Sequence, residues 1–179
     1  MGREITIVPY DESWPNLYEK EKNVLLGIFG SLATDIQHFG STSVKGMAAK
    51  PIIDIMIVAD DLHLIDDCNV AMEAHGYIAR VENGIPGRRY FVKLNSDQSG
   101  NHTHHVHVYQ TGNRHINDEL MFRDYLRIDP AAFEEYGQVK KEAALKYRRD
   151  PQAYTDAKSA CVMKIMEIAR SYFAGHTCR

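Results

Sequence analysis

Apolar positions recur with strand-like and helix-like periods along this chain, and beyond about residue 112 only the helical period remains. Short apolar runs predict β-strands at residues 36–39, 52–58, 77–81, 88–94 and 103–109. Helical spacing predicts helices at residues 13–34, at about 60–76 and 118–128, and after the pairs Asp129-Pro130 and Asp150-Pro151. We therefore expect a sheet-containing domain at residues 1–112 and a helical subdomain at 113–179.

Some of these elements carry more detailed predictions. The last three strands follow one another through segments rich in turn-forming residues, which predicts a meander of antiparallel hairpins. The last helix is expected to turn one apolar stripe toward the core, with members Ala157, Cys161, Ile165, Ile168 and Tyr172.

Length and composition narrow the class of protein. The 179 residues are 44% hydrophobic and 25% charged, as in ordinary globular domains, and the net charge of −3 makes a nucleic acid an unexpected partner. The chain lacks a run of ~20 apolar residues and an apolar leader, so we expect a cytoplasmic protein with no membrane partner. Cys68, Cys161 and Cys178 are widely spaced, which predicts reduced thiols rather than disulfides or a zinc–thiolate site.

A loop of small residues between the first two strands is the first candidate for chemistry. It contains Gly40, Ser41, Thr42 and Ser43, and Asp54 follows on the next strand. Glycine lets a ligand approach the backbone closely, and hydroxyl and amide groups can hold phosphate oxygens. Because Asp54 interrupts an apolar strand, its carboxylate must be paired, hydrogen-bonded or bound to a cation. A simple turn is the alternative interpretation of the loop.

The second candidate is a strand rich in histidine, near residues 102–109. Alternation places His105 and His107 on one face of this strand and His104 on the other. Imidazoles two residues apart can converge on one ion, and they suit a transition metal such as zinc or manganese better than magnesium. A ladder of hydrogen-bonded histidines on a half-exposed sheet is the alternative.

Basic residues would supply the other half of a phosphate site. Lys50 precedes the acidic strand, while Arg89 and Lys93 share one face of their own strand. Lys140 and Lys158 belong to the C-terminal helices, which are expected to close over the sheet. A solvated surface position is the alternative for each of these side chains.

These segments together resemble a known family. Residues 38–55 read HFGSTSVKGMAAKPIIDI, which is similar to the signature of the GrpB family, whose domain also occurs behind dephospho-CoA kinase in some bacteria. Similar segments lie at residues 88–93, 105–108, 122–126 and 154–158. The resemblance implies an α+β fold of the DNA polymerase β-like nucleotidyltransferase type, with a mixed five-stranded sheet, helices and a C-terminal helical subdomain.

The resemblance also implies roles for the candidate residues. In that fold a Gly-Ser pair after the first strand binds phosphate, and strand carboxylates bind metal, which implies phosphate contacts in the loop at 40–43 and a catalytic, metal-binding Asp54. The chain departs from the two-metal pattern, because Met56 stands at the second acid of Asp-x-Asp and His105 and His107 replace the third acid. One divalent cation, magnesium, manganese or zinc, is the expected cofactor.

We therefore expect a protein that binds a divalent metal and a nucleotide or phosphorylated small molecule, and that transfers a nucleotidyl or phosphoryl group. A catalytically silent binding module is one alternative, which Met56 favours. A hydrolase that activates water on a single metal at Asp54 and the His-x-His strand is another.

Overall fold

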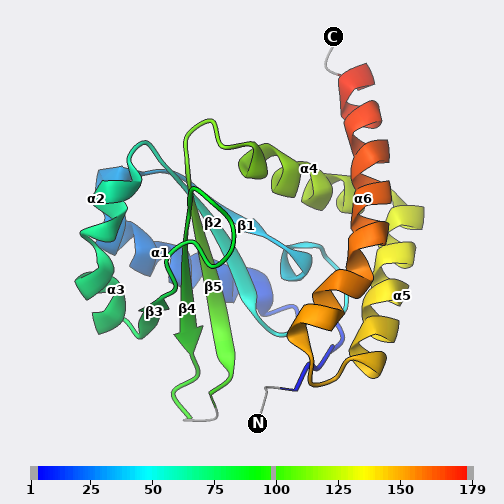
Figure 1. Ribbon diagram of the computed structural model, residues 1–179, viewed down its shortest axis with the longest axis horizontal. Helices are drawn as coiled ribbons and strands as arrows, with labels where there is room; N and C mark the ends of the chain where they lie inside the picture. Colours follow the sequence, from blue (N-terminus) through cyan, green and yellow to red (C-terminus); the bar gives the residue numbers. More distant parts are fainter. Residues whose placement is uncertain (1–3, 98–99, 177–179) are drawn as a thin grey trace.

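The computed structural model describes residues 4–97 and 100–176, in which the strands form one sheet with helices on both faces (Figure 1). The strands are β1 (Ala33–Phe39), β2 (Ile53–Ala59), β3 (Tyr77–Ala79), β4 (Arg88–Leu94) and β5 (His102–Gln110). The helices are α1 (Trp14–Phe29), α2 (Leu62–Asp66), α3 (Asn69–Ala74), α4 (Arg114–Ile128), α5 (Pro130–Lys146) and α6 (Pro151–His176). The short helical turns η1 (Gly30–Leu32) and η2 (Ser41–Ser43) flank β1.

Two predicted helices differ from the structure, one in its end and the other in its continuity. Helix α1 stops at Phe29 rather than near residue 34, because Gly30 has a φ of 52° and donates its N–H to the Leu26 carbonyl. The helix predicted at 60–76 is divided into α2 and α3, since the chain turns at Asp67 and Cys68. The expected division of the chain at residue 112 falls in the turn between β5 and α4.

The predicted stripe of the last helix is correct only at its centre, because Ala157 at its start is exposed. Cys161 and Ile165 are buried as expected, and Ala169 joins them. Ile168 and Tyr172 are 45% and 40% exposed, so they do not complete the stripe. The buried side of α6 continues instead from Ala169 to Phe173, which packs against the helical core.

The sheet is mixed, with the strand order β1-β2-β5-β4-β3. The last three strands form the predicted antiparallel meander, whereas β2 and β5 run parallel at the centre. This parallel pairing sets Asp54 beside His105 and Met56 beside His107. Residues far apart in sequence are thereby placed side by side on two neighbouring strands.

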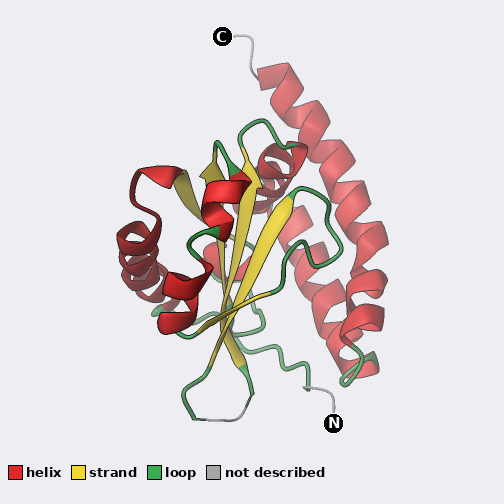
Figure 2. Cartoon of the chain, turned by 60° about the vertical axis from the view of Figure 1, so that its left-hand side comes forward, coloured by secondary structure: helices red, strands yellow, loops and turns green. Residues whose placement is uncertain are grey.

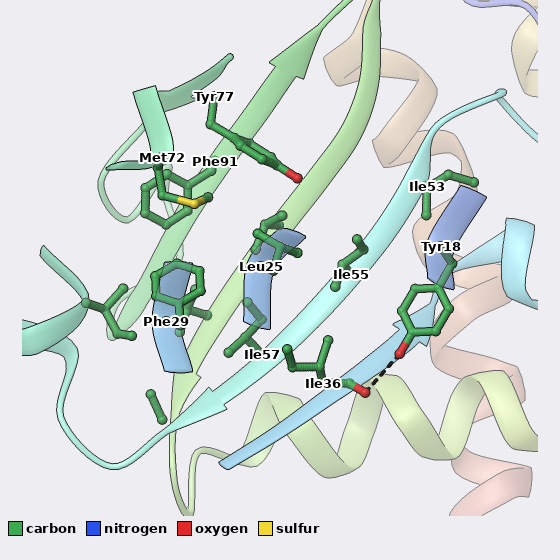
Figure 3. Packing of buried hydrophobic residues seen from close by; sticks show 14 of the residues in the cluster. Tyr18, Leu25, Phe29, Ile36, Ile53, Ile55, Ile57, Met72, Tyr77 and Phe91 are labelled. Atoms are coloured by element: carbon green, nitrogen blue, oxygen red, sulfur yellow. Dashed lines mark hydrogen bonds between the residues drawn. The ribbon is translucent and has the colours of Figure 1, made fainter. Parts of the chain in front are cut away.

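One face of the sheet carries the main apolar core, beneath α1, α2 and α3. Ile55 and Ile57 of β2 and Phe91 of β4 pack there against Leu25 and Phe29 of α1 (Figure 3). A buried tyrosine of α1, Tyr18, donates its hydroxyl to a β1 carbonyl at 2.9 Å. This face is closed to ligands by its packing.

The opposite face is covered by α4, α5 and α6, which form a second helical layer (Figure 2). Val44 and Met47 of the loop before β2 are buried among these helices. Within the described ranges, none of the helices combines the length and apolar character that a membrane span requires. Cys68 and Cys161 are free thiols, and Cys178 lies outside the described residues.

Candidate functional site

A pocket of about 450 Å³ opens between the second face of the sheet and the C-terminal helices. Its floor comes from the loop after β1 and from the start of β2, and its walls come from α4, α5 and α6. Lining residues from the sheet side include Gly40, Ser41, Thr42, Lys50, Asp54 and His105. Those from the helices include Glu119, Arg123, Tyr136, Lys140, Tyr154 and Lys158.

Gly40 has a structural role that differs from the expected one. Its φ of 68° and ψ of −174° belong to a region that residues with a Cβ rarely occupy. A Cβ built at Gly40 would lie only 2.6 Å from Oδ2 of Asp54. The glycine thus makes room for the Asp54 carboxylate, whereas the sequence interpretation assigned that space to a ligand.

The loop hydroxyls are used unequally. Ser43 donates to the Gly40 carbonyl at 2.6 Å, and the buried Thr42 donates to the Ile52 carbonyl at 3.3 Å, so both bonds hold the turn. Ser41 lines the pocket and bonds to the Tyr136 side chain of α5. Of the hydroxyls predicted to contact phosphate, Ser41 therefore has the position best suited to a ligand.

Asp54, His105 and His107 come together on the second face of the sheet. The structure offers one potential ligand atom from each residue, and these atoms lie within 4.8 Å of one another. Nδ1 of His105 is 3.2 Å from Oδ1 of Asp54, and Nε2 of His105 is 2.8 Å from Nδ1 of His102. Alternation along β5 and the parallel pairing with β2 produce this grouping.

Burial and charge act in opposite senses on this group. Burial alone would raise the pKa of Asp54, but the hydrogen bond from His105 and the nearby basic groups outweigh it and hold that pKa below 3.8. Burial lowers the pKa of His107 to about 3, so its imidazole is neutral at pH 7. Nη1 of Arg88 lies 3.3 Å from Nδ1 of His107.

Three lysines from separate elements meet in the pocket. Nζ of Lys50 lies 5.2 Å and Nζ of Lys158 4.2 Å from the ring centre of Tyr154. Lys140 is 2% exposed and donates to the Ala48 carbonyl at 2.7 Å. Burial and the neighbouring lysine charges lower the pKa of Lys140 to about 7, and burial with the charge of Lys50 lowers that of Lys158 to about 8.

The structure does not bring Arg89 and Lys93 to this pocket. Both project from β4 toward the opposite face, where Arg89 pairs with Asp66 of α2 at 2.5 Å and Lys93 pairs with Glu21 of α1 at 2.6 Å. Their expected role in binding substrate is corrected on this ground. Alternation placed them correctly on one common face, but only the strand pairing shows that Asp54 lies on the other.

Sequence reasoning missed Glu119 of α4, which lines the pocket. The Tyr109 hydroxyl donates to its Oε1 at 2.9 Å, and burial, together with the charge of Asp54, raises the pKa of Glu119 to about 7. A glutamate in a polar helix gives no signal by itself, because only the approach of α4 to β5 buries it. Arg123 was also missed, and it donates to the His38 carbonyl at 3.0 Å.

Comparison with solved structures identifies the class of fold. The structure of Cid1 in complex with its short product ApU matches 75% of this chain and 42% of that one, with a TM-score of 0.52 and 13% identity. Cid1 is described elsewhere by its RNA terminal uridylyl transferase activity. At this identity the likeness shows the fold alone, and it confirms an α+β fold of the polymerase β-like nucleotidyltransferase type.

The chain belongs to the GrpB protein family, which residues 4–168 match. The crystal structure of the conserved protein GrpB from Enterococcus faecalis is similar over 94% of this chain and 99% of that one, with a TM-score of 0.86 and 35% identity. Glutamate-rich protein GrpB of Alkalihalophilus pseudofirmus is 37% identical over 91% of this chain and 94% of its own length. UPF0157 protein YqkA of Bacillus subtilis is 39% identical over 97% of this chain. The matched region is only 49% of YqkA, so this chain spans about half the length of that relative.

Proposed function

We propose that this chain binds the phosphate groups of a nucleotide or another phosphorylated molecule in the pocket, together with one divalent cation. The convergence of Lys50, Lys140 and Lys158 carries this proposal. Lysines held this close in a partly buried site repel one another, and a polyanion that binds between them relieves the repulsion. Ser41 adds a hydroxyl donor on the same wall.

The donor set of Asp54, His105 and His107, of which the first two line the pocket, fits a single cation. One carboxylate and two imidazoles suit a transition metal, and they lack the clustered carboxylates that a pair of magnesium ions prefers. As a ligand through Nδ1, His105 would carry its proton on Nε2, where His102 lies 2.8 Å away and can accept it. Arg88 opposes the set, because its guanidinium donates toward His107.

Nucleotidyl or phosphoryl transfer is the reaction class that we propose for this arrangement. A divalent cation, when bound, polarises phosphorus–oxygen bonds and neutralises phosphate charge. The lysines and Ser41 would hold the phosphate chain. The Asp54 carboxylate, which lies close to Gly40, would keep a fixed orientation toward the phosphate that reacts.

A binding module without transferase activity is the second candidate. Met56, which occupies the position of the second acid, is completely buried beside Phe39 and Tyr109. A thioether in this apolar setting does not replace a metal-binding carboxylate.

Calorimetric titration with tripolyphosphate and with manganese tests the proposal. Lys158→Met should weaken tripolyphosphate binding at least tenfold, whereas Lys164→Met, on the exposed side of the same helix, should leave it unchanged. Asp54→Asn should remove manganese binding. A wild-type chain that binds neither probe would refute the proposed function. Pyrophosphate release from nucleoside triphosphates in the presence of acceptors would separate transfer from simple binding.

A further inference from the structure

Glu119 presents an unused hydrogen-bond acceptor at the pocket. Its Oε1 is bonded to the Tyr109 hydroxyl at 2.9 Å, which fixes the carboxyl group in place. Its Oε2 is buried, and no hydrogen-bond donor meets it within the part of the chain that the structure describes. A buried carboxylate oxygen without a donor is costly for the fold, so such an atom in a pocket marks the place of a missing partner.

The surroundings of Glu119 restrict what this partner is. Glu119 is not among the residues that can jointly coordinate a cation, since that group consists of Asp54, His105 and His107 within the described residues. The neighbouring Asp118 is paired with Arg170 of α6 at 3.0 Å, so its carboxylate already has a donor. In its ionised form, which prevails above pH 7, the acceptor at Glu119 therefore requires a donor from the ligand.

The charges along the pocket indicate which part of the ligand supplies the donor. Lys140 and Lys158 attract phosphate, whereas the carboxylate of Glu119 repels it. A ligand that satisfies both ends has anionic phosphates and, at a distance from them, a neutral or cationic group with O–H or N–H bonds. Inorganic phosphate chains have no such group, and nucleosides have several on the sugar and the base.

We propose that Glu119 is a specificity-determining residue whose Oε2 accepts a hydrogen bond from an O–H or N–H group of the nucleoside part of a nucleoside polyphosphate. This inference rests on the proposed function, because the lysines must first hold the phosphate chain. It assigns the ligand class as nucleoside polyphosphates rather than bare polyphosphates. Tyr109 positions the carboxylate and does not contact the ligand in this arrangement.

The test compares ATP with tripolyphosphate by calorimetry, on the wild type and on Glu119→Met. Methionine has nearly the same length and replaces the carboxylate by a thioether, which is uncharged and only a weak acceptor. We expect ATP binding to weaken about tenfold, the effect of one lost hydrogen bond to a charged group. Tripolyphosphate binding should stay equal or become tighter, since a negative charge is removed. Glu167→Met is the matched control, because Glu167 of α6 is exposed and lies outside the pocket lining, so this variant should preserve the ratio of the two affinities.

Each result has a distinct meaning. Equal affinities of the wild type for tripolyphosphate and for each common nucleoside triphosphate would overturn the inference without any variant, even if Glu119→Met failed to fold. An unchanged ATP-to-tripolyphosphate ratio in folded Glu119→Met would overturn it as well, while the phosphate site stood. If the wild type bound neither ligand, the proposed function itself would fall.

Discussion

Replacing Gly40 by alanine should both strain the backbone and displace the Asp54 carboxylate. The backbone conformation of Gly40, with φ 68° and ψ −174°, costs about 1–3 kcal/mol for a residue with a Cβ. The new methyl group would lie 2.6 Å from Oδ2 of Asp54, so the carboxylate must move and its 3.2 Å contact with His105 is lost. That hydrogen bond to a charged group adds about 1.5–3 kcal/mol.

Together these effects predict a loss of about 2.5–6 kcal/mol in the free energy of unfolding, which is on the order of 10 °C in the midpoint of thermal unfolding. Manganese binding should disappear in the same variant. The matched control is Gly84→Ala, because Gly84 also has a positive φ, of 83°, but a Cβ there meets nothing within 4 Å. It should cost about 1–2 kcal/mol, from backbone strain alone.

Differential scanning calorimetry of the two variants, and of Gly40→Ala in an Asp54→Ala background, measures the contact separately from the strain. The penalty of Gly40→Ala should shrink when the carboxylate is absent. If Gly40→Ala cost no more than Gly84→Ala, or if its cost were the same with and without Asp54, the reasoning that the glycine exists to seat the aspartate would be refuted.

Further predictions concern protons and cations. Affinity for tripolyphosphate should fall as the pH rises from about 6 to 9, since Lys140 and Lys158, with pKa values of about 7 and 8, lose their charge in that window; a flat calorimetric profile would contradict this. Stability should fall as the pH drops below about 6.5, because burial lowers the pKa of His38 to about 4 and of His107 to about 3, so the unfolded chain binds more protons there. Urea titrations at pH 7 and 5 should show this loss, and His38→Gln should reduce it by up to about 1.4 kcal/mol per pH unit. Arg88→Met should tighten manganese binding, because it removes the donor that faces His107, and weaker binding in a folded variant would show that Arg88 supports the cation site instead.

Much of the sheet side of the pocket was predictable from residue patterns. A lone aspartate in an apolar strand requires a polar partner, and alternation places two histidines of a later strand on one face. That β2 and β5 are neighbours, and that Asp54 shares the face of His105, depends on strand pairing across about fifty residues of sequence. The same dependence on strand pairing explains the error at Arg89 and Lys93. Alternation correctly placed both on one face of β4, but it could not show which face of the sheet this is.

The helical side was less accessible to sequence reasoning. Lys140 and Lys158 were candidates because they lie on helices expected to cover the sheet, and the structure places both in the pocket. Glu119 had no such signal, since its burial arises from the packing of α4 against Tyr109 and not from any local pattern. Tertiary contacts between separate elements determine which polar side chains become buried.

The seating of Asp54 against Gly40 joins two parts of the pocket mechanically. A ligand that moves the Ser41 turn would also move the Asp54 carboxylate that lies against Gly40. A cation that moves this carboxylate would in turn displace the Ser41 turn. Binding of the anion would then alter the affinity for the cation, and the cation would alter the affinity for the anion by the same factor, because thermodynamic linkage is reciprocal. Cooperativity between anion and cation would thus depend on the absence of a Cβ atom at Gly40.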